Sequence, residues 1–264
     1  MTSNEYILIT GASGGLASSV ISLVKDKYHI IATDLVINNN ADYFSFPCDI
    51  TKDDDINKLY NFVLSKTSKL YAIINLAGIF KMDSVTEGDI DKLKKVMEVN
   101  FYGTYRINQK FIPILDKGSK IINCTSELAS FSAIPFNGFY TLSKVTLSNY
   151  SDTLRRELNY LGIKVVKVEA GSFKTNLLNK PSGDYDALVN NTKYYKKELG
   201  KLKKMMDGEL NKTHDPIIFA KVIKKILNKK NPKICYHVKR SVKLRIMNML
   251  PNKVQDNIYK NVIK

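Results

Sequence analysis

The stretch EYILITGASGGLASSV, residues 5–20, places a glycine-rich turn directly after an apolar run. The run at 5–10 predicts a buried strand, and the apolar spacing of residues 16–27 predicts a helix. Glycines let the backbone turn sharply and approach a phosphate closely, and the N-terminus of the following helix offers free N–H groups and a positive dipole end. The turn at 10–17 therefore predicts a nucleotide site between the first strand and the first helix.

Short apolar runs alternate with longer amphipathic stretches along the rest of the chain. Strands are predicted at 5–10, 29–34, 44–49, 71–78, 120–126, 164–171 and 233–238. Helices are predicted at 16–27, at 51–63 with Thr51 as the N-cap, at 89–115, at 138–161, and from Thr213 or Asp215 onward. Near-continuous apolar strands are typical of a parallel sheet covered on both faces. The sequence therefore predicts an α/β fold, a doubly wound, Rossmann-like parallel sheet of about seven strands with helices on both faces, forming a single domain over residues 1–264.

Two segments depart from this alternation. Residues 176–213 break the rhythm, and we interpret them as an insertion with short helices that acts as a substrate lid. Residues 239–264 form a basic C-terminal extension of two amphipathic helices separated by Pro251. Apolar side chains fall on one face of each helix: Val242, Ile246, Met249 and Leu250 in the first, and Val254, Ile258 and Val262 in the second.

The positive charge of the chain is concentrated in its last quarter. The net charge is +16, and residues 193–264 hold 20 basic and 5 acidic residues. This asymmetry favours an anionic partner for the last quarter, although a solvated basic face is the alternative. Nucleic acid is not the expected partner, because the basic residues are interleaved with apolar helix positions and no reading motif appears. A weak contact of 239–264 with an anionic membrane surface, or packing of its apolar stripes on the domain or a second subunit, both agree with the pattern.

The sequence favours a cytoplasmic protein, with a peripheral position at a membrane surface as the alternative. The chain has no apolar run of about 18 residues that would predict a transmembrane helix and no signal-peptide pattern at its start. Its three cysteines lie far apart in or beside strand-like runs, as reduced thiols do. The three histidines lack metal-ligand spacing, so no metal site is predicted.

The segment GFYTLSK, residues 138–144, holds Tyr140 and Lys144 four positions apart, which places both on one helical face. A phenol with a pKa of about 10 is a poor acid or base at neutral pH. A nearby ammonium group lowers that pKa, and the first turn of a helix also favours an anion. Together with Ser126 at the end of a predicted strand, the pair indicates acid–base catalysis.

These motifs together resemble the short-chain dehydrogenase/reductase family, in its branch of about 250 residues. The resemblance covers roughly residues 5–175. TGASGGLA resembles the family's T-G-x-x-x-G-x-G with Ala17 in place of the last glycine, and CDI at 48–50 resembles its adenine-side aspartate motif. NLAG at 75–78 resembles N-x-A-G, and EAGSFKT at 169–175 resembles P-G-x-x-x-T with Ala170 in place of proline.

The resemblance implies a catalytic set of Asn100, Ser126, Tyr140 and Lys144. Tyr140 would exchange a proton with the substrate, Lys144 would lower its pKa and hold the nicotinamide ribose, and Ser126 would hydrogen-bond the substrate oxygen. Asn100 would anchor a water that leads from Lys144 to solvent. The gap between Ser126 and Tyr140 is one residue longer than the family's commonest spacing, so Thr125 is the alternative to Ser126. Implied cofactor contacts are Thr10, Gly11, Ser13, Gly14, Gly15, Leu16, Asp34, Asp49, Ile50, Asn75, Ala77, Gly78, Tyr140, Lys144, Gly171, Phe173 and Thr175.

Asp34 at the end of the second strand favours NAD over NADP as the cofactor. A carboxylate there can accept both ribose hydroxyls and would repel a 2′-phosphate. Neither Ser13 nor Leu35 is basic, so neither would neutralise such a phosphate.

The predicted function is an NAD-dependent oxidoreductase that interconverts a secondary alcohol and a ketone. Apolar and aromatic residues at 127–139 and 172–178 favour an apolar or lipid-like substrate. Glu127 either faces that substrate or is a solvated loop charge. The alternatives are a nucleotide-binding redox sensor that acts through a partner, and an NADP-dependent reductase of the same family. The resemblance also implies a homodimer or homotetramer formed through the helices at 89–115 and 138–161.

Overall fold

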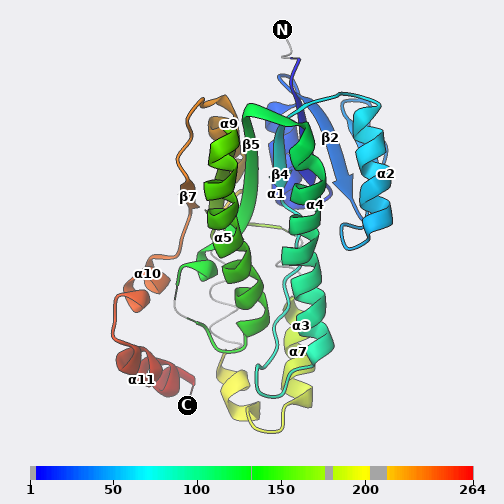
Figure 1. Ribbon diagram of the computed structural model, residues 1–264. Coiled ribbons are helices and arrows are strands. Elements are labelled where there is room, and N and C mark those ends of the chain that lie inside the picture. The colour runs from blue at the N-terminus through cyan, green and yellow to red at the C-terminus, as the bar shows by residue number, and fades with distance from the viewer. Residues whose placement is uncertain (1–3, 132, 176–180, 203–212, 264) are drawn as a thin grey trace.

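The computed structural model describes residues 4–131, 133–175, 181–202 and 213–263 (Figure 1). All seven strands are parallel and follow the order β3-β2-β1-β4-β5-β6-β7. The strands are β1 (Tyr6–Thr10), β2 (His29–Asp34), β3 (Phe44–Pro47), β4 (Leu70–Asn75), β5 (Leu115–Ser126), β6 (Lys164–Ala170) and β7 (Cys235–Val238). The chain runs from β1 outward to β3 and then crosses to β4, so the order reverses between β1 and β4. The predicted doubly wound, Rossmann-like sheet is therefore confirmed.

Helices cover both faces of the sheet, and the alternation of side chains along β1 shows why. Ile7 and Ile9 pack against α1 and α9 on one face, whereas Leu8 packs against α2, α4 and α5 on the other. All three side chains are fully buried, because each strand residue points to the face opposite that of its neighbours. The helices on the sheet are α1 (Gly15–Val24), α2 (Asp53–Leu64), α4 (Thr104–Phe111), α5 (Gly138–Leu158) and α9 (Pro216–Asn228), whereas α3 (Ile90–Met97) lies beyond the ends of the strands (Figure 1).

The single helix predicted over 89–115 is wrong in detail. The segment contains α3, a π-helical turn at Glu98–Gly103, α4 and a 3-10 turn at Ile112–Ile114, and β5 begins at Leu115. A π-helical turn inserts an extra residue into the helix and is frequent at functional sites. Here it carries Asn100, which is fully buried.

The N-caps of α2 and α9 differ from each other in their agreement with the sequence prediction. Thr51 is not the N-cap of α2, because Lys52 occupies that position and the Thr51 hydroxyl instead donates to Asp49 Oδ1 at 2.7 Å. Asp215 is the N-cap of α9, and its carboxylate accepts a hydrogen bond from the backbone N–H of Ile217 at 2.8 Å. This acceptor satisfies one of the free N–H groups at the helix start.

The described part of the predicted insertion is packed rather than extended. It contains α7 (Pro181–Asn191) and a further helical turn at 196–202. Glu87 holds it to the body, because its carboxylate accepts from Thr192 Oγ1 and from the N–H of Lys193, both at 2.7 Å. A separate apolar cluster joins it to the loop after β4: Met82, Tyr185, Leu188, Leu199 and Leu202. Residues 176–180 and 203–212 of the predicted lid lie outside the described residues.

The C-terminal extension folds as α10 (Val242–Asn248) and α11 (Asn252–Ile263), divided at Pro251 as predicted. Figure 1 shows both helices standing to one side of the sheet and its covering helices. Where the chain is described, none of its helices is both long and apolar enough to span a bilayer.

Lys120 near the start of β5 is an unusual core residue, since its side chain is almost fully buried. Its Nζ donates to the Tyr71 hydroxyl and lies 4.0 Å from the centre of that ring. The Tyr71 hydroxyl in turn donates to the Leu227 carbonyl at 2.6 Å. Burial lowers the pKa of Lys120 from 10.5 to about 8, because a charged ammonium is poorly solvated there.

The pH dependence of stability should reveal this buried lysine. Between the folded pKa of about 8 and the unfolded value of 10.5, the unfolded chain binds more protons, so stability rises with pH. The melting temperature of the wild type should therefore rise relative to that of Lys120→Met between about pH 7.5 and about pH 10. Lys230→Met, which removes one charge from an exposed position, is the control. A difference between wild type and Lys120→Met that stays constant with pH would contradict the assignment.

Candidate active site

The carboxyl ends of β1 and β4 meet at the glycine-rich turn, where Gly11 has a φ of +69°. A Cβ on Gly11 would lie 2.6 Å from the backbone nitrogen of Ala77, so only glycine fits this approach. Gly14 is the N-cap of α1 and has no side chain that could occupy the N–H groups of the first turn. The Thr175 methyl lies 3.2 Å from where a Cβ of Gly15 would be, so Thr175 sits over the turn. This small, donor-rich concavity fits a dinucleotide pyrophosphate.

Thr10 and Asn75 brace this edge of the sheet from below. The Thr10 hydroxyl accepts from the N–H groups of Leu76 and Ala77, each at 3.3 Å. The Asn75 amide donates to the side-chain oxygens of Asn108 and Asn123, each at 2.8 Å. Both side chains are buried, and the Thr10 hydroxyl and the Asn75 Nδ2 hold the two loops in place, while the Asn75 Oδ1 has no hydrogen-bond partner among the described residues.

Asp34 joins the end of β2 to the glycine-rich turn. Its Oδ2 accepts from the N–H of Ser13 at 2.9 Å and its Oδ1 from the N–H of Leu35 at 2.7 Å. The Ser13 hydroxyl donates to the Val36 carbonyl at 2.7 Å. Leu35 and Val36 are 64% and 74% exposed, which is unusual for apolar side chains of their size and leaves an apolar surface beside the carboxylate.

Asp49 and Ile50, the predicted adenine-side residues, follow β3, and Gly78 lies in the loop after β4. Asp49 accepts from the N–H and the hydroxyl of Thr51, so its carboxylate stabilises its own turn. Ile50 is buried, and a Cβ on Gly103 would lie 2.6 Å from its Cδ1. On the catalytic side, a Cβ on Gly78 would lie 3.6 Å from Lys144 Nζ, so the cofactor loop borders the acid–base pair.

Tyr140 and Lys144 lie on α5 and are both buried at its sheet-facing side. The helix begins at Gly138, so Tyr140 is in its first turn, as predicted. Lys144 Nζ donates to the Cys124 carbonyl at 3.0 Å and lies 5.7 Å from the centre of the Tyr140 ring. The Ser126 side chain at the end of β5 hydrogen-bonds that of Tyr140. The structure thus brings three of the predicted catalytic side chains together.

Ser126, not Thr125, faces the tyrosine. Adjacent strand residues point to opposite faces of a sheet. The Thr125 hydroxyl accordingly lies near the Val168 carbonyl of β6, to which it donates at 3.4 Å. The extra residue between Ser126 and Tyr140 lies in the loop, where a 3-10 turn at Glu127–Ala129 begins with the Ser126 hydroxyl accepting from the N–H of Leu128.

The pKa of Tyr140 is raised, not lowered as expected from the nearby Lys144. Burial raises the pKa of Tyr140 well above 10, and the hydrogen bond from Ser126 only partly opposes this. Burial likewise lowers the pKa of Lys144. The spacing correctly placed the two groups together, but a site closed to water disfavours both charged forms.

Asn100 connects the π-helical turn to the end of β4 and to α5. Its Oδ1 accepts from the N–H of Ile79 at 2.7 Å, and its Nδ2 donates to the Ile79 carbonyl and to Ser143 Oγ, each at 2.9 Å. Ser143 donates to the Tyr140 carbonyl at 2.7 Å. Sequence reasoning missed Ser143, since only its position beside Lys144 could have indicated it.

The Phe173 side chain lies in the core. The ring is buried in the core and packs edge-to-face on Phe219 of α9, at 5.9 Å between ring centres. Phe173, the aromatic residue of the segment 172–178 predicted to line the substrate site, is therefore a core residue. Residues 176–178 lie outside the described residues. Gly171 keeps a tight position, since a Cβ there would lie 2.0 Å from the Lys239 carbonyl oxygen.

Residues 5–186 match the family described as short chain dehydrogenase. The chain belongs to the short-chain dehydrogenase/reductase family. It is accordingly an NAD(P)-dependent dehydrogenase or reductase.

Named relatives of this short-chain dehydrogenase/reductase include two reductases. It is 30% identical over 205 residues to the NADPH-dependent 1-acyldihydroxyacetone phosphate reductase of Schizosaccharomyces pombe, covering 74% of this chain and 69% of that one. It is 27% identical over 232 residues to the 3-ketodihydrosphingosine reductase of Bacteroides thetaiotaomicron, covering 86% and 85%. A short-chain dehydrogenase structure from Streptomyces avermitilis shares the fold, with a TM-score of 0.75, 19% identity, and coverage of 99% of this chain and 96% of that chain.

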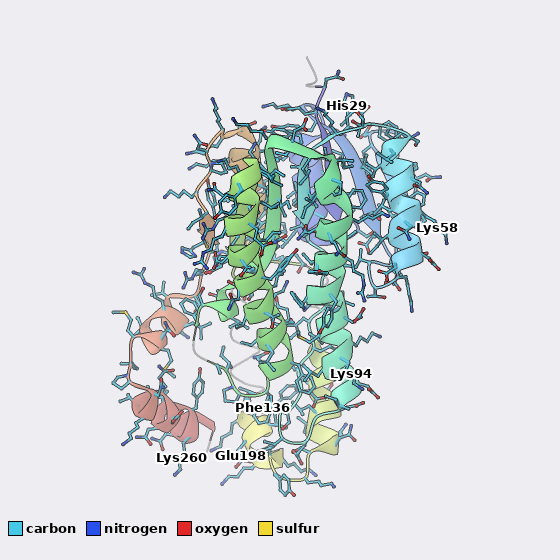
Figure 2. All side chains as sticks on the ribbon, viewed as in Figure 1. His29, Lys58, Lys94, Phe136, Glu198 and Lys260 are labelled. Carbon is cyan, nitrogen blue, oxygen red and sulfur yellow. The ribbon has the colours of Figure 1, made fainter. Side chains whose placement is uncertain are left out.

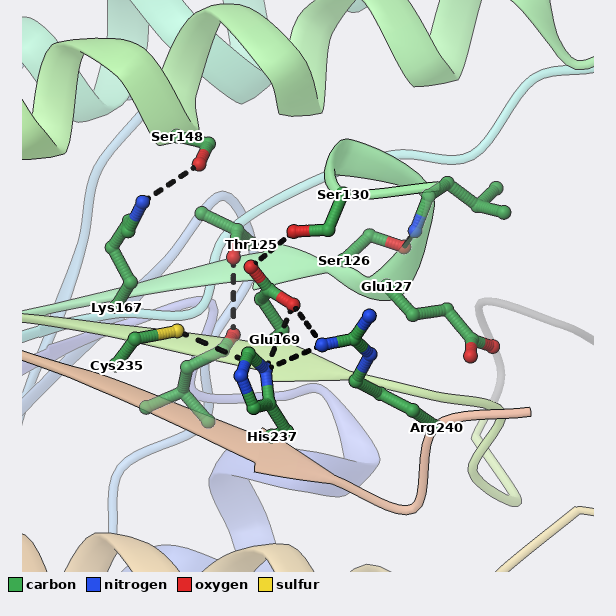
Figure 3. A network of polar contacts seen from close by, with 12 residues as sticks. Thr125, Ser126, Glu127, Ser130, Ser148, Lys167, Glu169, Cys235, His237 and Arg240 are labelled. Carbon is green, nitrogen blue, oxygen red and sulfur yellow. Dashed lines mark hydrogen bonds and ion pairs between the residues drawn. The ribbon is translucent and has the colours of Figure 1, made fainter. Parts of the chain in front are cut away.

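A buried acidic network lies behind Ser126 in this short-chain dehydrogenase/reductase (Figure 3). Glu169 of β6 accepts from the Ser130 hydroxyl at 2.5 Å and pairs with Arg240 at 3.2 Å. Glu127 Oε2 accepts from the N–H of Ser241 at 2.5 Å. Glu127 is buried, so it is not a solvated loop charge. Its carboxylate is hydrogen-bonded to Ser241 of the chain itself.

The same network contains the one group of three potential metal ligands in the described part of the chain. Glu169, Cys235 and His237 offer ligand atoms within 4.8 Å of one another. Arg240 Nη1 lies 2.9 Å from His237 Nδ1 as well as beside Glu169. The guanidinium therefore already supplies the positive charge that a metal would bring.

Gly11→Ala should damage both the fold and the nucleotide site. The positive φ and the close approach to Ala77 should lower the free energy of unfolding by about 2–4 kcal/mol. Gly200→Ala is the control, since this exposed helical glycine lies outside the nucleotide turn and a Cβ there would meet no described atom within 4 Å. Chemical denaturation and cofactor binding by fluorescence would measure both effects. Equal stability of the two variants would contradict the close-approach argument.

Proposed function

We propose that this protein catalyses the NAD-dependent interconversion of a secondary alcohol and a ketone on an apolar, lipid-like substrate. The observation that carries the proposal is the convergence of Tyr140, Ser126 and Lys144 beside Gly78, next to the nucleotide turn. When bound, the nicotinamide supplies or accepts the hydride. The protein supplies the proton, the orientation and a site with little water.

Tyr140 acts as the acid–base group, and its burial favours the neutral phenol. A neutral phenol can donate its proton to the oxygen of a ketone as that oxygen gains charge. Ser126 can donate a hydrogen bond to the same oxygen and stabilise the developing charge. In the oxidation direction, Tyr140 would have to lose its proton first, and the raised pKa opposes this.

Lys144 and Asn100 support the tyrosine. One Lys144 proton is held by the Cys124 carbonyl, so the ammonium is fixed and its other protons can reach a cofactor ribose and a water. Asn100 fixes the start of α5 through Ser143. We propose that Asn100 also anchors the water that connects Lys144 to solvent.

The substrate side of Tyr140 is apolar. The Phe80 ring packs edge-to-face on the Tyr140 ring, with 4.9 Å between centres. Phe80 also packs on the apolar cluster that holds 181–202, which supports the lid proposal for 176–213. Both relatives reported above are named for lipids that carry a keto group, which agrees with a lipid-like ketone as substrate.

We further propose a cytoplasmic homodimer or homotetramer that uses α4 and α5. The structure leaves large apolar side chains exposed on this segment, as expected of a surface that a second copy covers. They are Tyr102, Tyr105, Leu142 and Val145. The cysteines are free thiols, in agreement with a reducing compartment.

Tyr140→Phe should lower kcat about 10²–10⁴-fold, because it removes only the hydroxyl that moves the proton. NAD binding should persist, since the glycine-rich turn proposed to hold the pyrophosphate does not involve the Tyr140 hydroxyl. The assay is absorbance of the reduced nicotinamide with a panel of long-chain ketones and secondary alcohols. A variant that keeps about a tenth of wild-type kcat would show that another group performs the proton transfer, and a wild type inactive on the whole panel would favour the redox-sensor alternative.

Asp34→Ala should weaken NAD and improve NADP use, because it removes a ribose acceptor and a repulsive charge. Asp34→Asn separates these effects, since it keeps an acceptor for the N–H of Ser13 but not the charge. Asp42→Ala, an exposed carboxylate paired with Lys25, controls for loss of one negative charge. The ratio of kcat/KM for the two cofactors is the measurement. A wild type that already prefers NADP, as the name of the fission-yeast relative states for that enzyme, would refute NAD.

A further inference from the structure

The first helix of the C-terminal extension turns its apolar stripe to solvent. Val242, Ile246 and Met249 share one face of α10, and they are 69%, 57% and 78% exposed. Leu244 and Met247, on the opposite face, are half-buried. These three side chains therefore do not pack on the body of their own chain, whereas Leu250, the fourth member of the predicted stripe, is half-buried. Of the second stripe, Val254 is 41% exposed, Ile258 is half-buried, and the side chain of Val262 is not described.

Basic side chains flank this stripe. Arg245 and Lys243 lie on either side of it along α10, and both are exposed. On α11, Lys253 and Lys260 are also exposed, and Figure 2 shows Lys260 on the outer part of the extension. Residues 239–264 contain seven basic residues and one acidic residue.

This charge pattern disfavours a second copy of the chain as the covering partner. In a two-fold interface the same patch faces itself, so Arg245 and Lys243 would face their own counterparts across an apolar strip only one side chain wide. Like charges opposed in this way repel. A bilayer of anionic lipids complements both features, since its acyl region accepts the apolar stripe and its headgroups attract the cations.

We propose that α10 and α11 form a docking surface for anionic lipid bilayers. Val242, Ile246 and Met249 enter the headgroup region, while the surrounding lysines and arginines contact the phosphates. Each cation near the surface is expected to raise the partition coefficient roughly fivefold.

The extension begins at the active-site network, which links docking to the substrate entrance. Ser241, the N-cap of α10, donates its N–H to Glu127, the residue after Ser126. Arg240 pairs with Glu169, and its guanidinium lies 4.2 Å from the centre of the Phe131 ring. A docked bilayer would therefore lie close to the loop that follows Ser126. Delivery of a lipid substrate from it depends on the proposed function, whereas docking itself does not.

Vesicle sedimentation of the full chain tests the docking surface without any turnover. The probes are phosphatidylcholine vesicles and equimolar phosphatidylcholine–phosphatidylglycerol vesicles, at low and high salt. The protein should sediment with the anionic vesicles alone and be released by high salt, because salt screens exposed charges. I246E/M249E should abolish sedimentation. R245Q/K260Q should lower the partition coefficient roughly 30-fold.

A matched control separates this surface from general positive charge. K58Q/K94Q removes two exposed lysines from α2 and α3, away from the extension in Figure 2, and should leave sedimentation unchanged. All the substitutions replace exposed side chains, and circular dichroism checks that each variant is folded. No sedimentation of the wild type with anionic vesicles at low salt would overturn the proposal, as would an equal loss in K58Q/K94Q. A smaller oligomer for I246E/M249E by light scattering would assign the stripe to a second copy and also overturn it.

Discussion

The close approach of Gly11 to the backbone of Ala77 is the constraint on which the site depends. It brings the ends of β1 and β4 together at the point where the strand order reverses, so that α1 and the loop after β4 border one concavity. Thr10 and Asn75 then use their side chains to hold this approach from inside the sheet. The catalytic residues lie on the next strand and helix, and their position follows from the same sheet edge.

Burial is the second determinant of the chemistry. Tyr140 and Lys144 lie where water is scarce, so each is driven toward its neutral form despite being close to the other. A bound cofactor with a positive nicotinamide would change this balance, because a fixed charge in a dry site acts strongly on its neighbours. The protonation state of Tyr140 is therefore expected to depend on the charge of the nicotinamide bound beside it.

The two buried glutamates behind Ser126 give the C-terminal extension a defined place. Glu127 accepts a hydrogen bond from the N–H of Ser241, the N-cap of α10, and Glu169 pairs with Arg240 one residue earlier. Each buried carboxylate has a hydrogen-bond or ion-pair partner in the extension. A buried anion without such a partner would be strongly destabilising. The extension is therefore tied to the catalytic loop at its base, while its helices remain exposed at the far end.

The sequence by itself determined the parallel sheet, the nucleotide turn and the spacing of Tyr140 and Lys144. These follow from local periodicity and from glycine, whose effects act within a few residues. It did not determine the break of the 89–115 helix into a π-helical turn, the inward position of Phe173, or the partners of Glu127. Each of these results from contacts between segments far apart in the chain, such as Phe173 with Phe219 and Glu127 with Ser241. The direction of the Tyr140 pKa shift was also decided by the tertiary structure, because desolvation depends on everything packed around the phenol and not on the lysine one turn away.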